Sequence, residues 1–555
     1  MKLWVLLFVL MLGMAHAEPS VVDRFFSDYL FKFNPTQGTT SGFHQYDKLL
    51  EDYSRRNVDA QAKVLHSFEK EFLQQPDTPD RELILSKIHS DLLALEDIRM
   101  WEKNPDQYSS GVTESIFCIM SRNFAPQPVR LESVIAREQQ IPAVFQAARA
   151  NLKNPPHIYT QIALEQLPGI IGFFQKDVPL AFNEVKDKNL LGRFHQSNEA
   201  VIRSLESYQT FLKTDVLPRS HGDFRLGTRN FEKKLAYDEM VDIPLDRLLK
   251  IGFEDLRRNQ QQFREVAAKI DPNKTPQQIL ADLEHDHPAP GKLLQTFRDV
   301  LGGLRSYVID HKIVKVPSMV LPIVEETPPF MRALTFASMD TPGPYEKVAK
   351  EAFFNVTLPE PNWPKPKVEG LMEAFNRGTV VSTAIHEVYP GHYVQFLWIQ
   401  QIPSKVRKLI GANSNAEGWA HYCEQMMLDE GYGNGDPKLR LGQLQDALLR
   451  DARYIVGIEM HTRGMTMKQG IEFFVKEGYQ TEETGKRETE RGTSDPTYLY
   501  YTLGKLEILK LRADYHKMQG SKFSLEEFHD NFMKQGYPPI KIVRKALLGN
   551  DSPVL

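Results

Sequence analysis

The sequence predicts a mainly α-helical protein with one small β-sheet, for three reasons. Apolar residues recur at helical spacing along most of the chain. One central stretch is instead rich in β-branched and apolar residues and has no helical period. The 41% of hydrophobic residues is enough to build a sizeable core from 555 residues.

Two long helices illustrate the pattern in the first half of the chain. Arg81–Asn104 carries apolar residues one helical turn apart. A second helix is predicted to begin at Pro244, where the missing N–H costs nothing, and to run towards Ile270. Asp242 stands just ahead of it as the expected cap.

Three extended segments are predicted in the middle of the chain, namely Lys312–Glu325, Met331–Met339 and Lys350–Leu358. Two prolines in the first segment make it an edge strand or a broken one. Pro359–Lys367 holds four prolines and is predicted as a loop. The remaining chain is predicted to be helical almost to its C-terminus, so the small sheet comes just before the segment discussed below.

The N-terminus has the pattern of a secretory signal peptide. Lys2 and a short apolar run lead to Ala15-His16-Ala17, which predicts cleavage after Ala17. The run is short for a membrane anchor, and no Cys follows it, so a lipoprotein anchor is not expected. We expect an exported protein, periplasmic or secreted, without stable membrane insertion after cleavage.

The charge balance and the cysteines exclude several classes of protein. With 68 basic and 72 acidic residues, the chain lacks the basic surface expected for binding nucleic acid. Cys118 and Cys423 are too few for a disulfide framework. One long-range bridge stays open, but two buried thiols are favoured.

The strongest chemical signal is STAIHEVYPGH, residues Ser382–His392. It offers His386 and His392 as ligands, with Glu387 directly after the first histidine. Two histidines and a later glutamate are the ligands of a catalytic zinc site that keeps a fourth position for water. A glutamate next to the first histidine is where such sites hold their general base.

The spacing of the two histidines is unusual. The common zinc-protease helix places them at i and i+4, whereas here they stand at i and i+6. On an unbroken helix His392 would point about 120° away from His386. Pro390 and Gly391 could absorb the insertion as a bulge. The alternative is that the helix ends near Val388 and leaves two unrelated histidines.

A second segment, AEGWAHYCE, supplies the third ligand candidate. Glu417, His421 and Glu424 would share one face of a helix. Glu417 is the predicted metal ligand. Glu424 or His421 could orient a ligand from behind. The alternative is a solvated polar face, and for His421 that alternative is favoured.

A third cluster lies further along the chain. His461 or Tyr501 could donate a hydrogen bond to a developing oxyanion. Arg491 could bind a substrate carboxylate with both prongs of its guanidinium, and Tyr498 is a second candidate for substrate binding. The alternative is that these tyrosines pack in the core and that the arginine is solvated.

HEVYPGHYVQ and AEGWAHYCE resemble the paired signature HExxPGHxxQ and EGWAxYxE of the bacterial domain-of-unknown-function 885 family. Three further segments resemble that family, so the resemblance covers nearly the whole mature chain: Asn34–Ser54, Leu226–Leu256 and Ile458–Phe474. It implies a helical, gluzincin-like zinc peptidase fold. Residues 18–555 would form one catalytic region, with two helical halves around a cleft and the metal site at 382–424.

Carried over by position, the resemblance implies that His386, His392 and Glu417 bind one Zn²⁺ and that Glu387 is the base. His461, Arg491 and Tyr501 would lie near the substrate. The chain departs from the family pattern RYxxxPGQAxSYxxG in its last motif. Gly492 replaces the tyrosine, Thr497-Tyr498 replace Gly-Gln, and the segment is one residue shorter, which leaves the substrate contacts open.

The resulting hypothesis is an exported zinc metallopeptidase whose partner is a peptide. Zinc would lower the pKa of bound water to about 7, and Glu387 would accept the proton. Met331–Met339 or Phe353–Val356 could pair with the peptide as an added strand. Two alternatives stay open: a metal-dependent hydrolase of another amide or ester, and a peptide-binding protein with a non-catalytic metal site. The sequence does not predict an oligomeric state.

Overall fold

The computed structural model describes residues 19–328, 332 and 336–555. The predicted signal peptide and its cleavage point after Ala17 lie outside these residues. The described chain is mainly helical with one small sheet, so the predicted fold class is confirmed. No helix in the described ranges is both long and apolar enough to cross a membrane.

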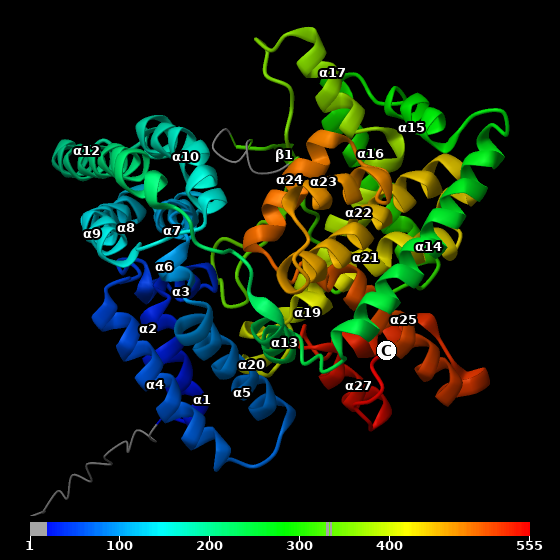
Figure 1. Cartoon of the computed structure of the whole chain (residues 1–555), viewed down its shortest axis with the longest axis horizontal. Coiled ribbons are helices and arrows are strands. Elements are labelled where there is room, and N and C mark those ends of the chain that lie inside the picture. Colours follow the sequence, from blue (N-terminus) through cyan, green and yellow to red (C-terminus); the bar gives the residue numbers. More distant parts are fainter. Residues whose placement is uncertain (1–18, 329–331, 333–335) are drawn as a thin grey trace, which may run out of the picture.

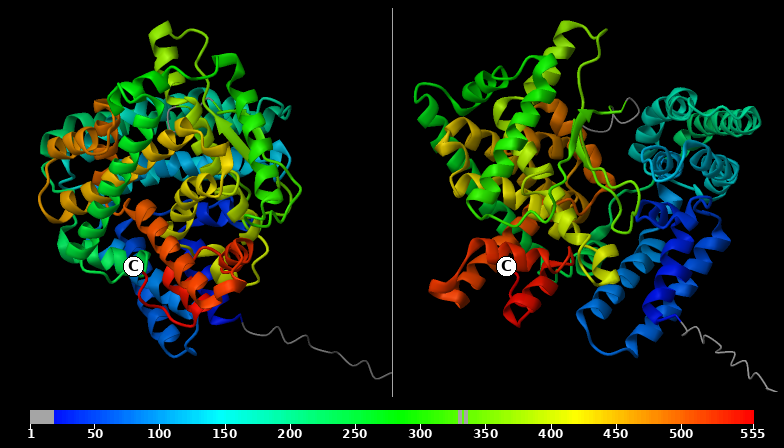
Figure 2. Two further views of the ribbon diagram at one scale, coloured as in Figure 1. Left: turned by 90° about the vertical axis from the view of Figure 1, so that its right-hand side faces the viewer. Right: turned by 180° about the vertical axis from the view of Figure 1, so that it is seen from behind.

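The helices gather in two groups that lie side by side (Figure 1). The first group, on the left of that view, holds α1 (Val21–Arg24), α2 (Phe31–Phe33), α3 (Pro35–Thr40), α4 (Arg55–Leu73), α5 (Pro79–Leu92), α6 (Met100–Lys103), α7 (Asp106–Met120), α8 (Gln127–Glu138), α9 (Ile141–Asn151), α10 (His157–Gly172), α11 (Val178–Ala181) and α12 (Lys188–Phe211). The second group, seen from two further sides in Figure 2, holds α13 (Gly227–Asp238), α14 (Leu245–Ile270), α15 (Pro276–Glu284), α16 (Leu293–Asp310), α17 (Lys365–Ala374), α18 (Arg377–Glu387), α19 (His392–Ile399), α20 (Lys405–Leu409), α21 (Asn413–Asp429), α22 (Pro437–Thr462), α23 (Met467–Lys476), α24 (Glu482–Ser494), α25 (Tyr500–Gln519), α26 (Leu525–Met533) and α27 (Ile540–Leu548). Helices α13 and α20 both contact α5, so they join the two groups.

The helix predicted over Arg81–Asn104 is present but interrupted. Helix α5 begins two residues earlier and continues as a π-helical turn, Leu93–Ile98. Arg99 then takes a left-handed backbone conformation with φ of 57°, which ends the regular helix. Helix spacing alone does not predict this break, because Arg99 carries no sequence signal for a left-handed residue.

Helix α14 starts at Leu245 and ends at Ile270, close to the prediction. The predicted cap is wrong, because Pro244 itself occupies the N-cap position with an extended backbone and no side chain caps the helix. Asp242 is exposed, and its carboxylate lies 3.9 Å from the Lys541 ammonium.

The sheet has three short strands, β1 (Ile323–Glu326), β2 (Ala337–Asp340) and β3 (Phe353–Val356), in the order β1-β3-β2. β1 runs parallel to β3, and β2 runs antiparallel to it. β1 is an edge strand that begins just after a proline, as predicted. β3 lies in the centre, so the prediction that its residues could pair with a peptide backbone is wrong. Much of the predicted segment Met331–Met339 lies outside the described residues.

One core of the second group connects the sheet with the helices that carry the two motifs. Phe354 of β3 packs edge-on against Phe297 of α16, with ring centroids 5.1 Å apart. The same core includes buried apolar residues of α18, α19, α21 and α25. The loop predicted over Pro359–Lys367 is shorter than predicted, because α17 begins at Lys365. Cys118 and Cys423 are both free and buried, as expected.

Candidate metal centre

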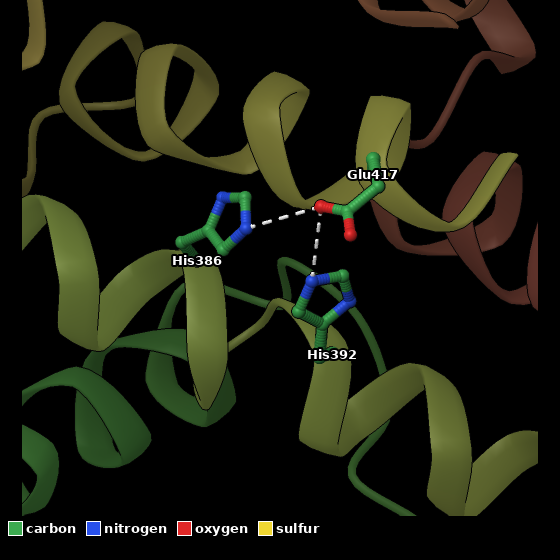
Figure 3. A group of neighbouring side chains, drawn as sticks. All are labelled: His386, His392 and Glu417. Atoms are coloured by element: carbon green, nitrogen blue, oxygen red, sulfur yellow. Dashed lines mark ion pairs between the residues drawn. The ribbon is translucent and has the colours of Figure 1, made fainter. Parts of the chain in front are cut away.

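Three side chains from three helices converge on one point (Figure 3). The Nε2 atoms of His386 on α18 and His392 on α19 each lie 3.4 Å from Oε2 of Glu417 on α21. One donor atom from each residue lies within 4.8 Å of the other two. The histidines are buried and Glu417 is partly exposed, so the three side chains lie just beneath the protein surface.

The chain turns sharply between the two histidines. Helix α18 ends at Glu387 and α19 starts at His392, so the helix does end near Val388. The histidines nevertheless meet, with ring centroids 4.8 Å apart and planes at 89°. The Gly391 N–H donates to the carbonyl of Ile385 at 3.0 Å. A Cβ at Gly391 would overlap the carbonyl of His386, so only glycine allows this close approach.

The two sequence motifs are held together by buried hydrogen bonds. Trp419 of α21 donates its indole N–H to the carbonyl of Pro390 at 2.9 Å. Gln395 of α19 donates to Asn415 of α21 at 2.9 Å. Gly418 packs directly against the backbone of α25 at Gly504. These contacts explain why the segments carry tryptophan, glutamine and glycine beside the candidate ligands.

Glu424 lies behind His386. Its carboxylate accepts a hydrogen bond from Nδ1 of His386 at 2.6 Å and another from Nδ1 of His421 at 3.1 Å. It also forms an ion pair with Arg450 at 2.9 Å. Glu424 and His421 are fully buried, so the solvated face favoured for His421 is wrong. Burial alone would raise the pKa of Glu424, but Arg450 and His421 hold it well below its usual range. A carboxylate that accepts from Nδ1 leaves Nε2 of His386 as the atom available to a metal.

The electrostatics of the three-residue group favour a bound cation. Burial lowers the pKa of His386, but its carboxylate partners Glu417 and Glu424 outweigh this and raise it to about 10. Burial likewise opposes ionisation of Glu417, but the neighbouring His392 and His386 hold its pKa well below the usual range. Two carboxylates thus draw positive charge to the point where the three donor atoms meet.

Two of the three separations between the donor atoms also match those expected of zinc ligands. Zinc binds imidazole nitrogen and carboxylate oxygen at about 2.0–2.2 Å, and two ligands at tetrahedral positions then lie about 3.4 Å apart. Both Nε2 atoms lie 3.4 Å from Glu417 Oε2. Among the described residues this oxygen is buried without a hydrogen-bond partner. A buried acceptor without a partner is costly unless a cation or water satisfies it.

Glu387 stands at the end of α18 beside the triad. Its Oε2 accepts a hydrogen bond from the backbone N–H of Met339 in β2 at 3.0 Å. Glu387 and His386 line a cavity of about 570 Å³. The carboxylate is therefore fixed between the sheet edge and the metal candidate, and it faces the space where a ligand would bind.

Tyr501 and Arg491 also line this cavity. The Tyr501 ring stacks on that of His386 at 6.5 Å between centroids. Burial and nearby Glu417 raise the pKa of Tyr501, which keeps its hydroxyl protonated as a donor. Arg491 pairs with Asp495 at 3.0 Å and donates to the Tyr501 hydroxyl at 3.5 Å.

His461 and Tyr498 are used for packing. His461 is buried, its Nε2 donates to the carbonyl of Gly492 at 2.7 Å, and its Nδ1 accepts from the N–H of Leu226 at 3.3 Å. Tyr498 is fully buried and its hydroxyl donates to the carbonyl of Glu488 at 3.4 Å. Neither residue lines the cavity. The geometry gives no support for the substrate-facing roles predicted for them.

Several residues of the cavity wall were not predicted from the sequence. Arg450 and Arg453 come from α22, and Asp446 of the same helix accepts a hydrogen bond from Ser382 at 2.6 Å. The arginines stand one helical turn apart, a spacing that places them on one face. The cavity is lined by described residues of the second group alone. A separate cavity of about 680 Å³ lies between α10 of the first group and α23 and α24.

Fold and site together define a mainly helical protein with a two-histidine, one-glutamate candidate metal centre beside a polar cavity. The chain belongs to the family described as bacterial protein of unknown function (DUF885), whose model matches residues 35–547. The family resemblance in the sequence is therefore confirmed.

Two solved structures are similar over nearly the whole chain. One is titled "The structure of a putative lipoprotein of unknown function from Shewanella oneidensis"; it is 27% identical, has a TM-score of 0.80, and the match covers 96% of this chain and 100% of that one. The other is titled "The crystal structure of the putative lipoprotein from Colwellia psychrerythraea"; it is 17% identical, has a TM-score of 0.78, and the match covers 93% and 96%. The second likeness concerns the fold alone. No curated protein sequence matched the chain.

Proposed function

We propose that this protein is an exported zinc-dependent metallopeptidase. The observation that carries the proposal is the meeting of two imidazole nitrogens and one carboxylate oxygen, with a second glutamate at the adjacent cavity wall. A purely structural site has no need of a base beside its ligands, and structural zinc sites are closed by four protein ligands. Here three protein donors leave one position for water.

Each residue has a role set by its contacts. His386, His392 and Glu417 would hold the ion, and Glu424 would orient His386 through Nδ1. Zinc bound there would activate water and polarise a carbonyl. Glu387 would accept the water proton and pass it to the leaving amine. Tyr501, kept protonated by burial, would donate to the oxygen that becomes negatively charged.

The sheet edge supports a peptide as the substrate. The N–H of Met339 in β2 points at Glu387, so the outer edge of β2 runs alongside the proposed base. A peptide that lies along this edge would bring its backbone beside that carboxylate. The cavity of about 570 Å³ lies in the range of small-ligand sites, which favours short peptides over folded proteins.

Zinc content and peptide hydrolysis test the proposal together. Purified protein should hold one zinc per chain, and it should cleave members of a mixed peptide library. Glu387→Gln should retain zinc and lose cleavage, because only the base is removed. Cleavage of no library member by zinc-loaded wild type would favour a peptide-binding protein, and cleavage of model esters or other amides alone would favour the other hydrolase.

A surface cluster provides the matched control. His285, Glu369 and Glu373 also bring three donor atoms together, but two of them are exposed. Glu369→Gln should keep one zinc per chain and full activity. Loss of zinc in this variant, with zinc retained in Glu387→Gln and in His386→Ala, would place the ion on the surface and defeat the site assignment.

Export is supported by the N-terminal sequence pattern and by the two solved relatives, each described as a "putative lipoprotein". The mature chain is expected to begin at Glu18. Mass measurement of the protein recovered from its native envelope tests this. A mass that includes the first 17 residues would contradict cleavage there.

A further inference from the structure

Two helices bring four arginines to the wall of the cavity. Arg450 and Arg453 stand three residues apart on α22, and Arg487 and Arg491 stand four apart on α24. Each pair therefore shares one helix face. All four line the same cavity as His386 and Glu387. Such a concentration of guanidinium groups beside a candidate hydrolytic centre needs a chemical explanation.

Three of the four arginines lie over the ring of Tyr501, and the fourth, Arg487, lies over the ring of Phe336. The guanidinium carbons of Arg450, Arg453 and Arg491 are 5.5, 5.0 and 5.8 Å from the centre of the Tyr501 ring. That ring stacks on His386. An extended chain advances about 3.3–3.6 Å per residue. An anion held by the arginines would therefore be only a few residues from the bond placed at the metal.

Most of these arginines have protein partners, and one does not. Arg450 pairs with Glu424, and Arg453 forms a two-pronged pair with Glu488 at 2.7 and 3.0 Å. Arg491 pairs with Asp495. Within the described ranges Arg487 has no carboxylate at ion-pair distance, and it lies over the Phe336 ring at 5.3 Å.

The charge around Glu488 is not balanced within the protein. Its carboxylate lies near Arg453, Arg491 and Arg487, and all three lower its pKa against the effect of burial. Among the described residues Arg453 is the one that forms an ion pair with it. Arg487 is therefore the guanidinium of this corner that a ligand carboxylate can pair with.

We propose that the arginine cluster is a subsite for a carboxylate of the peptide, led by Arg487, and that the C-terminal carboxylate is its source. This rests on the proposed function. The α-carboxylate is the anion that every unmodified peptide carries whatever its sequence, and guanidinium groups bind carboxylates in a forked geometry. Water would then break a C–N bond close to the C-terminus, releasing a short carboxy-terminal piece as the amine and leaving a new carboxylate on the rest.

Arg487 is the residue to change, because its removal leaves no buried carboxylate without a partner. Arg453→Gln would leave buried Glu488 unpaired and could unfold the protein. The matched control is Lys486→Gln, which removes one positive charge from the neighbouring position of α24. Lys486 is exposed, pairs with Glu490 at 3.8 Å and does not line this cavity.

Binding is measured by calorimetry on zinc-loaded Glu387→Gln protein, which should not turn the peptides over. The probes are pentapeptides without Asp or Glu, each as the free acid and as the C-terminal amide. A third set is amidated and carries Glu at the last position. We expect the free acid to bind about ten-fold or more tightly than the amide, since one charged hydrogen bond accounts for that factor. Adding Arg487→Gln should abolish the difference, and adding Lys486→Gln should leave it.

The outcomes separate this proposal from the proposed function. Equal affinity for all three peptide sets would overturn the carboxylate subsite, even if the protein cleaves peptides. Tight binding of the Glu-containing amides would keep the subsite but assign it to an acidic side chain, and would overturn the C-terminal source. Discrimination of acid from amide by a protein that cleaves nothing would support the subsite and defeat the peptidase. In wild type, cleavage sites located by mass spectrometry should lie within a few residues of a free C-terminus.

Discussion

Two regions of the second helical group were both predicted from sequence to hold functional residues, and they differ in how their buried polar atoms are hydrogen-bonded. Around α18, α19 and α21, buried ligand atoms point at one another, and Oε2 of Glu417 has no hydrogen-bond partner among the described residues. Around the end of α22 and the start of α25, both nitrogens of His461 and the Tyr498 hydroxyl are bonded to backbone. Unsatisfied polar atoms mark a place for a ligand, whereas satisfied ones mark packing.

The largest effect on zinc content and activity is expected from a substitution in the candidate metal centre. Glu417→Ala removes the carboxylate between the two histidines, so zinc should be lost and peptide hydrolysis should fall by roughly a thousand-fold or more. The matched change in the other region, His461→Ala, should leave one zinc per chain. Metal analysis and hydrolysis of the same library by both variants check this. Full zinc and activity in Glu417→Ala would remove it from the site.

A smaller loss is expected behind His386. Glu424→Gln keeps the shape but weakens the hydrogen bond to Nδ1 and leaves Arg450 without its charge partner. Zinc affinity should fall about 10–100-fold, the usual effect of such an outer carboxylate. Competition with a chelator of known affinity measures it. Glu430 caps the same helix and pairs with Arg512 at 2.6 Å, away from the candidate ligands, so Glu430→Gln should leave the zinc affinity unchanged.

Much of the fold could be predicted from sequence because its signals are local. Helix α14 and edge strand β1 follow directly from spacing and proline. The break at Arg99 could not be predicted, since a left-handed arginine has no local signal. The central place of β3 could not be predicted either, because strand order depends on contacts between distant segments.

The site was predictable where its chemistry resides in one motif. His386 and His392 were identified despite their spacing, yet the turn that joins them is a helix end followed by a new helix rather than a bulge. The burial of His421 and the use of His461 for packing depend on helices far apart in sequence. The arginine pairs of α22 and α24 have the helical spacing that places like charges on one face. This spacing indicates a functional site only when it is known that both helices line one cavity.

The close backbone contact between α21 and α25 offers a further test of how the candidate metal centre is held in place. Gly418, next to Glu417, has no room for a Cβ because it meets Gly504. Gly418→Ala should destabilise the protein by about 1–3 kcal/mol and weaken zinc binding, because the two helices must separate. Gly302→Ala, in a helix position with open space, should be neutral or slightly stabilising. Thermal unfolding of both variants, with and without zinc, distinguishes them.

The smallest expected effect tests whether His461 is a neutral packing residue. Burial lowers its pKa to about 4. In the unfolded chain its pKa is about 6.5. Between these values the unfolded chain binds a proton that the folded protein does not, so the free energy of unfolding falls as the pH drops from 6.5 towards 4. His461 should contribute a loss of about 2 kcal/mol between pH 7.5 and 5.

In His461→Gln that share of the pH dependence should vanish, measured as the change in urea midpoint with pH. His195→Gln, at an exposed position of α12, should keep the wild-type slope. An unchanged slope in His461→Gln would mean that this histidine is not held neutral, and would return it to the candidates for proton transfer.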